Sequence, residues 1–236
     1  MPKTPRPLAE LEPLPPRFLQ RPTLVVARHL LGCLLVRVEG RRLLVTRIVE
    51  TEAYVGQNDK ACHAAGGKTP RNEIMFRSPG TAYVYFTYGM HHCLNVVTEE
   101  EGFPAAVLLR AAEPVQGLEA IRARRGGRTD RELLSGPGRL CQGLAIDREL
   151  NAVDLTAPDS PVWLAEGAEI EDDRVATSGR IGISERAGEA RYYPWRFFER
   201  GSPFVSKGRP AVQRKKETRK GEETQQKETT RQGARK

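Results

Sequence analysis

Two acidic residues and a tyrosine stand close together in RIVETEAYVG, residues 47–56. The segment is rich in β-forming residues, which predicts a strand. Side chains alternate across a strand, so Glu50, Glu52 and Tyr54 are expected on one face. Ile48 falls on that face by the same count, and strand rise separates the two acids by roughly 6.5–7 Å. Paired carboxylates suit acid–base catalysis or metal binding, but a strand face that merely meets water fits equally well.

Two tyrosines in the segment YVYFTYG could complete a site around these acids. Tyr83 and Tyr85 share one face of a second predicted strand, and a ladder of this kind is usually core packing. The alternative is that Tyr85 faces a site. Glu52, Tyr54 and Tyr85 would then form an acid enclosed by aromatic faces.

The turn that follows this strand carries large apolar side chains. Tyr88, Gly89 and Met90 are predicted at a hairpin tip, where folding gains nothing from exposing them. An apolar tip can act as a wedge between stacked bases. The turn therefore indicates contact with nucleic acid.

Basic residues near glycines form possible phosphate contacts. The segment SGPGR, residues 135–139, opens a predicted helix, and the free N–H groups at a helix start favour anions. Four more arginines lie earlier in the chain: Arg122, Arg124, Arg125 and Arg128. The alternative is a capped helix with solvated arginines.

The histidines do not have the spacing of a metal site. Neither HExxH nor HxH occurs, and His91 and His92 would point to opposite faces of a strand. We therefore expect no metal. A metal-dependent nuclease stays as an alternative, and its ligands would be Glu50, Glu52, Asp59 and His63.

Hydrophobic patterning distributes these candidates over a single α+β domain. The predicted elements are a helix over 22–32, a hairpin over 33–56 turning at Glu39-Gly40, a loop over 57–72 with one helical turn near Lys60–Ala64, a second hairpin over 81–97, a strand over 105–114, a helix beginning at Pro114, a helix beginning at Ser135–Pro137, and short strands between 161 and 205. The domain spans residues 21–205. A Pro-rich leader, 1–20, and a tail, 206–236, are expected to be poorly ordered.

Charge and composition limit the partners. The chain of 236 residues is 39% hydrophobic and 29% charged, with a net charge of +8. Residues 206–236 hold 11 Lys or Arg and 4 Glu, a net of +7, so the body is close to neutral. A nucleic-acid surface on the body must therefore come from uneven placement of charge, while the tail would add non-specific affinity for DNA.

The termini and the cysteines point to the cytoplasm. The first 16 residues contain six prolines and no apolar stretch, unlike a signal peptide, and no apolar run reaches the ~20 residues of a membrane span. The four cysteines show no CxxC spacing, so we expect reduced, partly buried thiols.

Several long and irregular motifs occur in order between about Arg21 and Ser206: VETEAY, CHAAGGKTPRN, PGTAYVYFTYGM, CLNV, LLRAAEP, LSGPGRLCQGLAI and RGSPFVS. In this order they resemble the alkyladenine (3-methyladenine) DNA glycosylase family. The resemblance implies a curved, mostly antiparallel sheet with flanking helices and a protruding hairpin that inserts into DNA. It also implies a monomer that needs no cofactor and acts on duplex DNA containing damaged purines, in the cytoplasm or at a bacterial nucleoid.

The implied reaction is hydrolysis of the N-glycosidic bond of a flipped purine such as 3-methyladenine, 7-methylguanine, hypoxanthine or ethenoadenine, which leaves an abasic site. By the motif match, Glu52 resembles the general base that activates water and Arg110 its partner, expected to hold the pKa of Glu52 down. Tyr54 and Tyr85 resemble the walls that stack on the base. For Glu50 we expect a nearby Arg or backbone N–H as partner.

The remaining implied residues contact the base or the duplex. His63 and Ala61 would contact the base, and Asn95 would crowd the 2-amino group of normal guanine. The residues implied to bind DNA are Tyr88, Met90, His91, Thr69, Arg71, Arg139 and Ser202. Among them, Tyr88 would fill the gap left by the flipped nucleotide. A third class of function stays open, a module that binds distorted DNA without chemistry.

Overall fold

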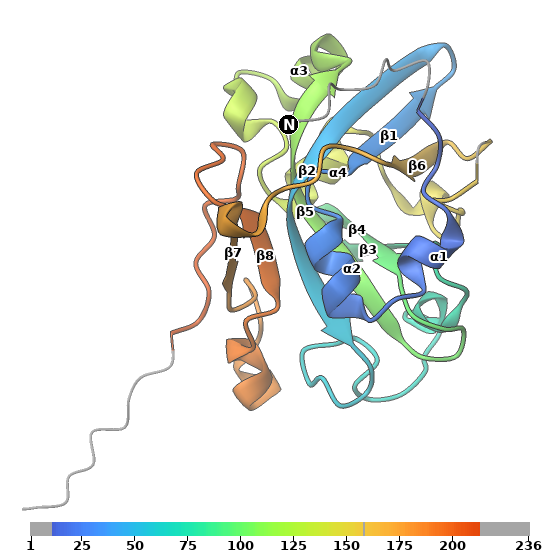
Figure 1. The fold of residues 1–236 in the computed structure, drawn as a ribbon, viewed down its shortest axis with the longest axis vertical. Coiled ribbons are helices and arrows are strands. Elements are labelled where there is room, and N and C mark those ends of the chain that lie inside the picture. The colour runs from blue at the N-terminus through green and yellow to red at the C-terminus, as the bar shows by residue number, and fades with distance from the viewer. Residues whose placement is uncertain (1–10, 158, 213–236) are drawn as a thin grey trace, which may run out of the picture.

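Strand β2, Arg42–Val55, runs through the centre of the molecule and organises the sheet (Figure 1). The computed structural model describes residues 11–157 and 159–212. Within these residues, every strand pairing is antiparallel, and the order is β3-β4-β5-β2-β1-β6, with β8 also paired to β2 and β7 to β8. The α+β class and the antiparallel sheet are thus confirmed.

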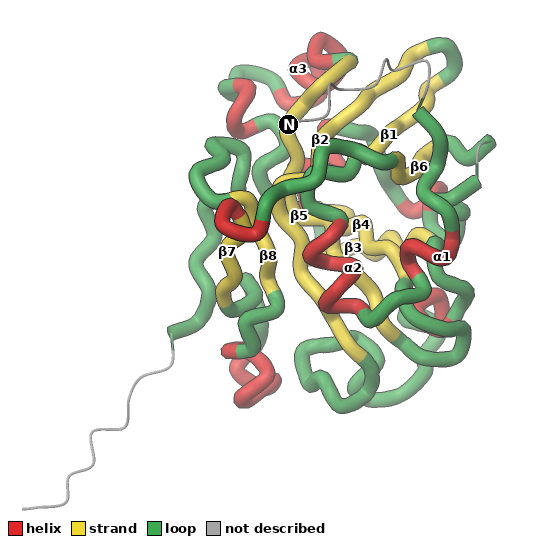
Figure 2. Tube along the Cα trace, viewed as in Figure 1, coloured by secondary structure: helices red, strands yellow, loops and turns green. Residues whose placement is uncertain are grey.

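Apart from β5, the remaining elements are short, and loops join them (Figure 2). The strands are β1 (Leu34–Glu39), β3 (Ala82–Thr87), β4 (His91–Val97), β5 (Ala105–Gln116), β6 (Val162–Ala165), β7 (Val175–Ser178) and β8 (Arg196–Glu199). The α-helices are α1 (Pro16–Leu19), α2 (Thr23–His29), α3 (Leu118–Arg125) and α4 (Pro137–Gly143). The 3₁₀ helices are η2 (Glu73–Phe76), η3 (Asp130–Glu132), η4 (Arg148–Leu150), η5 (Asp172–Arg174) and η6 (Glu185–Tyr192).

The sheet forks along one edge of β2. Strand β1 pairs with residues 42–47, β8 pairs with residues 50–52, and β5 follows the opposite edge. Since a strand has only two hydrogen-bonding edges, β1 and β8 must use the same edge in succession. Facing bulges mark the fork, where the register skips Val49 on β2 and Arg110 on β5.

The bulge changes which side chains of β2 share a face. Ile48 and Ala53 both pack in the main hydrophobic cluster although they are five residues apart, which is an odd number. The alternation therefore shifts by one residue between them. The prediction that Ile48 shares a face with Glu50 and Glu52 is wrong, because Ile48 faces the core and the two acids lie on the opposite side.

The main hydrophobic cluster joins helices to the sheet. Val26, Ala27 and Leu30 from α2 and its C-terminus meet Leu109 of β5, and Leu140 of α4 packs in the same cluster. A second cluster, which includes Tyr83, Met75 and Cys62, lies under the loop that follows β2. The loop is therefore anchored on its own small core.

Three predicted boundaries need correction. The strand expected to end at Pro114 continues as β5 to Gln116, so Pro114 opens no helix, and α3 begins after Gly117, whose φ is +79°. No helical turn forms near residues 60–64, where the chain makes turns instead. The hairpin turn at Gly40 and the start of α4 at Pro137 are confirmed.

The described part of the leader is ordered, contrary to the expected boundary at residue 20. Leu14 donates its N–H to Leu164 O at 2.6 Å, and Leu14 and Leu19 are buried. At the other end, Ser206 is buried and belongs to the domain rather than to the tail. Residues 1–10 and 213–236 lie outside the described residues. No helix in the described part of the chain has the length and apolar character needed to cross a membrane.

The link from α2 to β1 passes so close to the segment after β6 that only glycine fits there. A Cβ on Gly167 would lie 1.9 Å from the carbonyl oxygen of Gly32. We predict that Gly167→Ala lowers the free energy of unfolding by about 2–4 kcal/mol, since two backbone segments must separate. Gly66→Ala is the matched control, because a Cβ there meets nothing within 4 Å. Urea denaturation of both variants tests this, and equal midpoints would contradict it.

Candidate active site

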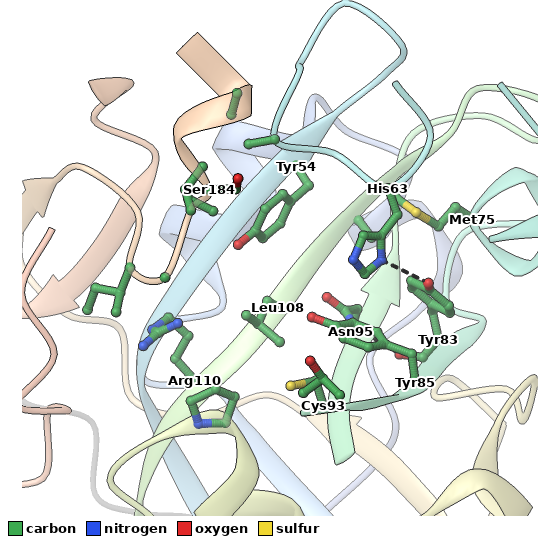
Figure 3. A pocket seen from close by; sticks show the side chains of 18 of the residues that line it. Tyr54, His63, Met75, Tyr83, Tyr85, Cys93, Asn95, Leu108, Arg110 and Ser184 are labelled. Atoms are coloured by element: carbon green, nitrogen blue, oxygen red, sulfur yellow. Dashed lines mark hydrogen bonds between the residues drawn. The ribbon is translucent and has the colours of Figure 1, made fainter. Parts of the chain in front are cut away.

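A cavity of about 770 Å³ opens between β2, the hairpin of β3 and β4, β5 and the segment 181–187 (Figure 3). Its lining includes six residues proposed for chemistry or base contact, namely Tyr54, Ala61, His63, Tyr85, Asn95 and Arg110. Tyr88, proposed as a DNA contact, also lines it. The tertiary fold thus brings together residues that are far apart in the sequence.

Glu52 lies directly behind the cavity wall and is completely buried. Tyr54 Oη donates to its Oε2 at 2.9 Å, and Arg110 Nη1 donates to the same oxygen at 3.2 Å. The N–H of Ile181 donates to Oε1 at 2.7 Å. All three donors border the cavity, so the carboxylate is held at its edge by residues of β2, β5 and the C-terminal segment.

The pKa of Glu52 differs from the expectation. Burial has the largest effect and raises the pKa above its ordinary value of 4.5, while Arg110, the Ile181 N–H and Tyr54 lower it without cancelling the effect of burial. Arg110 therefore acts in the predicted direction but does not dominate. The carboxylate of Glu52 therefore binds a proton more readily than an ordinary glutamate does.

Glu50 has a different environment although it lies only two residues away. Oε1 accepts from Arg110 Nε at 2.8 Å, from Arg196 Nε at 2.7 Å and from Ser206 Oγ at 2.8 Å, and Oε2 accepts from the Ser206 N–H at 2.7 Å. Burial raises the pKa of Glu50, but Arg110, Arg196 and Ser206 together lower it below the ordinary value. Glu50 is therefore an ionised anchor for two buried arginines. The expected partners, an Arg and a backbone N–H, are both present.

Aromatic rings form two sides of the cavity. Figure 3 shows Tyr54 across the cavity from His63 and Tyr85. The ring of Tyr85 lies 4.6 Å from that of His63 at an edge-on angle of 75° and 5.3 Å from that of Tyr83. Burial raises the pKa of Tyr54 well above 10, and Glu52 adds to this, so Tyr54 stays a hydroxyl donor.

His63 and Asn95 are both positioned through Tyr83. His63 Nδ1 lies 3.0 Å from Tyr83 Oη, and Asn95 Nδ2 donates to the carbonyl oxygen of Tyr83 at 3.0 Å. Burial lowers the pKa of His63, and the positive charge of Arg71 lowers it further. A neutral imidazole beside a neutral amide can contact a base through hydrogen bonds.

The loop that carries His63 is held in shape by Asn72, which sequence reasoning missed. The Asn72 amide donates to His63 O at 2.8 Å and to Gly67 O at 2.9 Å, and its oxygen accepts from the Thr69 N–H at 2.7 Å. Thr69 itself is exposed and does not line the cavity, whereas Arg71 does and lies 5.7 Å from the Tyr85 ring.

The hairpin tip is as exposed as expected. Tyr88 is 79% exposed and Met90 68% exposed, and the turn uses positive φ angles at Tyr88 and Gly89, 52° and 67°. A positive φ at a residue other than glycine costs about 1 kcal/mol or more, so the turn holds Tyr88 in an unfavourable conformation. The tip lies at the mouth of the cavity, because Tyr88 also lines it.

The other predicted DNA contacts lie outside the cavity lining. His91 is exposed and packs so closely on α4 that a Cβ on Gly138 would lie 2.9 Å from its ring. Arg139 is exposed and donates to Ser135 Oγ at 3.1 Å. Ser202 accepts from the N–H of Phe204 at 3.4 Å.

Two of the four arginines around α3 are already paired with acids, which weakens their assignment as phosphate contacts. Arg122 bridges Glu119 and Asp130 at 2.9 and 2.8 Å, and Arg124 pairs with Glu39 at 2.6 Å. Breaking such pairs to reach a phosphate would offset part of what the contact gains.

The acids proposed as metal ligands are neutralised by buried arginines. Arg110 joins Glu50 and Glu52, and Arg180 pairs with Asp59. In residues 11–157 and 159–212, no three His, Cys, Asp or Glu side chains gather where they could hold a metal ion. The four cysteines are all free and buried, as predicted. The geometry thus offers no ligand set to the nuclease alternative.

Sequence reasoning also missed the segment 180–187 as part of the site, because a short glycine-containing stretch with an arginine is typical of an exposed loop. Ile181, Gly182, Ile183 and Ser184 line one side of the cavity, and Arg180 is completely buried beside them. Only contact with β2, far away in sequence, distinguishes this segment from an ordinary loop. No local signal in the sequence marks it.

Comparisons with known proteins show the family of this chain. The family model described as "Methylpurine-DNA glycosylase (MPG)" matches residues 17–203. A Carboxydothermus hydrogenoformans protein named "Putative 3-methyladenine DNA glycosylase" is 52% identical over 82% of this chain and 98% of its own length. Relatives with the same name in Methanocella arvoryzae and Myxococcus xanthus are 49% and 50% identical, over 84% and 86% of this chain and 97% of each relative. The predicted resemblance is confirmed, and the chain belongs to the methylpurine-DNA glycosylase family.

Proposed function

We propose that this DNA glycosylase removes damaged purines from duplex DNA by direct hydrolysis, with Glu52 as the base that activates water. The observation that supports this most is the contact set of Glu52: a buried carboxylate held by Arg110 and Tyr54 at the edge of a cavity with an aromatic wall. The substrates proposed are 3-methyladenine, 7-methylguanine, hypoxanthine and ethenoadenine. The enzyme acts as a monomer without a cofactor, in the cytoplasm or at the nucleoid.

Chemistry at the sugar carbon requires the nucleotide to leave the base stack. Flipping costs a few kcal/mol, and a side chain that fills the gap offsets part of this cost. We assign this role to Tyr88, because it is 79% exposed and also lines the cavity, and the exposed Met90 beside it adds a second apolar group. The base then enters the cavity from the side on which the tip lies.

The aromatic walls favour alkylated bases. Alkylation at N3 or N7 makes a purine cationic, and each aromatic face contributes about 0.5–2 kcal/mol to binding a cation. Tyr54 and Tyr85 lie on opposite sides of the cavity, so both can face one flipped base. In this proposal, Asn95, which is buried on the cavity wall, crowds the 2-amino group of normal guanine.

The hydrogen bonds of Glu52 leave one acceptor position unused. A carboxylate has about four lone-pair positions, and Glu52 uses three of them, for Ile181, Tyr54 and Arg110. The remaining position on Oε1 can accept a proton from one water molecule. Arg110 can donate to the oxygen of that water, since only Nη1 of its terminal nitrogens is bound to Glu52 and Nη2 makes one long bond of 3.4 Å to Ser206.

We predict that Glu52→Gln abolishes base release while lesion DNA still binds, because the amide fits the site but cannot take a proton. The assay is release of hypoxanthine or 3-methyladenine from a duplex with a single lesion, in EDTA, with abasic sites counted. Release at the wild-type rate would refute the role of Glu52. Binding without any release by the wild-type protein would favour the non-catalytic module, and strand breaks that need Mg²⁺ or Mn²⁺ would favour the nuclease.

The raised pKa of Glu52 predicts an acid limb in the rate of excision. A general base works only when it is ionised, so the rate should fall as the pH decreases through the pKa of Glu52, at a midpoint above 4.5. 7-Methylguanine is the substrate for this test, because a base that is already cationic needs no proton to leave. Single-turnover rates with a no-enzyme control give the profile. A rate that stays constant down to pH 4.5 would contradict the assignment.

We predict that Glu50→Gln acts mainly on stability. Removing the charge leaves Arg110 and Arg196 with one buried anion fewer, which should cost about 3–5 kcal/mol of unfolding free energy. Excision per folded molecule should fall far less than in Glu52→Gln. The lowered pKa of Glu50 stabilises the fold fully above the ordinary value of 4.5, and this contribution is lost as the pH falls through the pKa of the folded state, so the stability difference should narrow below pH 4.5.

The control for this prediction is Glu113→Gln in the neighbouring strand. Glu113 pairs with Arg47 at 2.5 Å, but its side chain is 32% exposed, so its loss should cost no more than about 1 kcal/mol. Chemical denaturation compares the two variants. Equal stability of Glu50→Gln and wild type, or complete loss of excision in a folded Glu50→Gln protein, would contradict the assigned role.

A further inference from the structure

Arg180 is completely buried, although none of the proposed catalytic steps uses it. Its guanidinium carbon lies 4.8 Å from the centre of the Tyr54 ring and 5.1 Å from that of Trp195, so it contacts both rings. Arg180 does not line the cavity, whereas Tyr54 does. The guanidinium therefore supports Tyr54 from outside the space that receives the base.

Asp59 holds the guanidinium in a fixed orientation. Nη1 and Nη2 of Arg180 donate to the two carboxylate oxygens at 2.5 and 2.7 Å, and both groups are completely buried. The same nitrogens donate to Ala53 O and Ala190 O, each at 2.9 Å. A planar fork with four such contacts leaves little freedom to turn.

The pair connects three segments of the cavity wall. Ala53 belongs to β2, directly before Tyr54. Asp59 Oδ1 also accepts from the Ala61 N–H at 3.0 Å, which ties down the loop that leads to His63. Ile181, the residue after Arg180, donates its N–H to Glu52 at 2.7 Å. One ion pair thus sets the relative positions of a stacking ring, the base-contacting loop and a donor to the catalytic carboxylate.

Stability alone does not account for this arrangement. A buried ion pair is often no more stable than an apolar pair of the same volume. The Nε of Arg180 is also buried without a hydrogen-bond partner, which is a further cost. The contacts of the Arg180–Asp59 pair with Tyr54, with the loop that leads to His63 and with the segment that begins at Ile181 therefore need another explanation.

We propose that Arg180 and Asp59 are positioning residues for base recognition, with Arg180 as a plate that keeps Tyr54 parallel to a purine in the cavity. This inference rests on the proposed function, because it concerns the same flipped base. If the plate is lost, Tyr54 can tilt away and the base loses one stacking face. Misplacement of about 1 Å in such a site can cost up to about 100-fold in rate.

The test compares two double variants that remove the same charges. Asp59→Asn with Arg180→Met keeps an acceptor for the Ala61 N–H and a long side chain between Tyr54 and Trp195. Asp59→Asn with Arg180→Ala keeps the acceptor but removes the plate. Each is also combined with Glu52→Gln, and the fluorescence of ethenoadenine in a duplex then reports stacking of the base without chemistry.

We expect the Met variant to stack and release the base within about threefold of its parent. In the Glu52→Gln background, the Ala variant should stack ethenoadenine about tenfold or more weakly. With Glu52 intact, the same Ala variant should show a higher KM rather than a lower kcat. A folded Ala variant that stacks ethenoadenine as well as the Met variant would overturn the proposal. Equal loss in both folded variants would also overturn it. If the Ala variant does not fold, Trp195→Leu removes the ring on the other side of Arg180, and unchanged stacking there would overturn it.

The outcomes separate this inference from the proposed function. If the wild-type protein releases no damaged base but Glu52→Gln stacks ethenoadenine, the hydrolytic function fails while the role of Arg180 is still measured by fluorescence. If release occurs normally and the two double variants behave alike, only the role of Arg180 fails. If ethenoadenine never stacks in the Glu52→Gln protein, the positioning role is refuted.

Discussion

The contacts of Arg110 with Glu50 and Glu52 are the interaction on which the rest of the site depends. Arg110 Nε binds Glu50 at 2.8 Å and Nη1 binds Glu52 at 3.2 Å, so one planar group spans the two acids. This geometry exists because β2 and β5 carry facing bulges at the fork of the sheet, which turn both acids away from the core and place Arg110 opposite them. Without the bulges, strict alternation of side chains from Ile48 onward would have turned both acids toward the main hydrophobic cluster.

Environment then separates two residues of the same type. Glu50 accepts four hydrogen bonds from Arg110, Arg196 and Ser206, and its pKa falls. Glu52 has one cationic partner and complete burial, and its pKa rises. In the proposed mechanism, the two carboxylates with opposite pKa shifts serve as a fixed anion and a proton acceptor. The neighbouring tyrosine is kept as a hydroxyl by the same burial.

The cavity is built from segments that are distant in sequence, and buried polar groups hold them in place. Asn72 organises the loop over the second hydrophobic cluster, and Arg180 with Asp59 ties that loop to β2 and to the C-terminal segment. The exposed tip at Tyr88 meets the solvent at the mouth of the same cavity. Buried hydrogen bonds therefore hold the interior of the cavity in place, whereas a strained turn exposes the apolar tip.

By itself, the sequence determined the α+β class, both hairpins and the motifs that identify the family, because alternation, turn residues and motif order are local properties. It could not assign Glu50 and Glu52 to different roles from spacing, nor detect the bulge, since both depend on the register of β5 and on arginines from other strands. It placed Pro114 in a helix, because proline near a helical pattern is typical of a first turn, whereas pairing with Thr46 keeps it in β5. Arg180 and Ser206 were invisible as site residues for the same reason: burial and partners arise only when segments more than 100 residues apart in sequence come into contact.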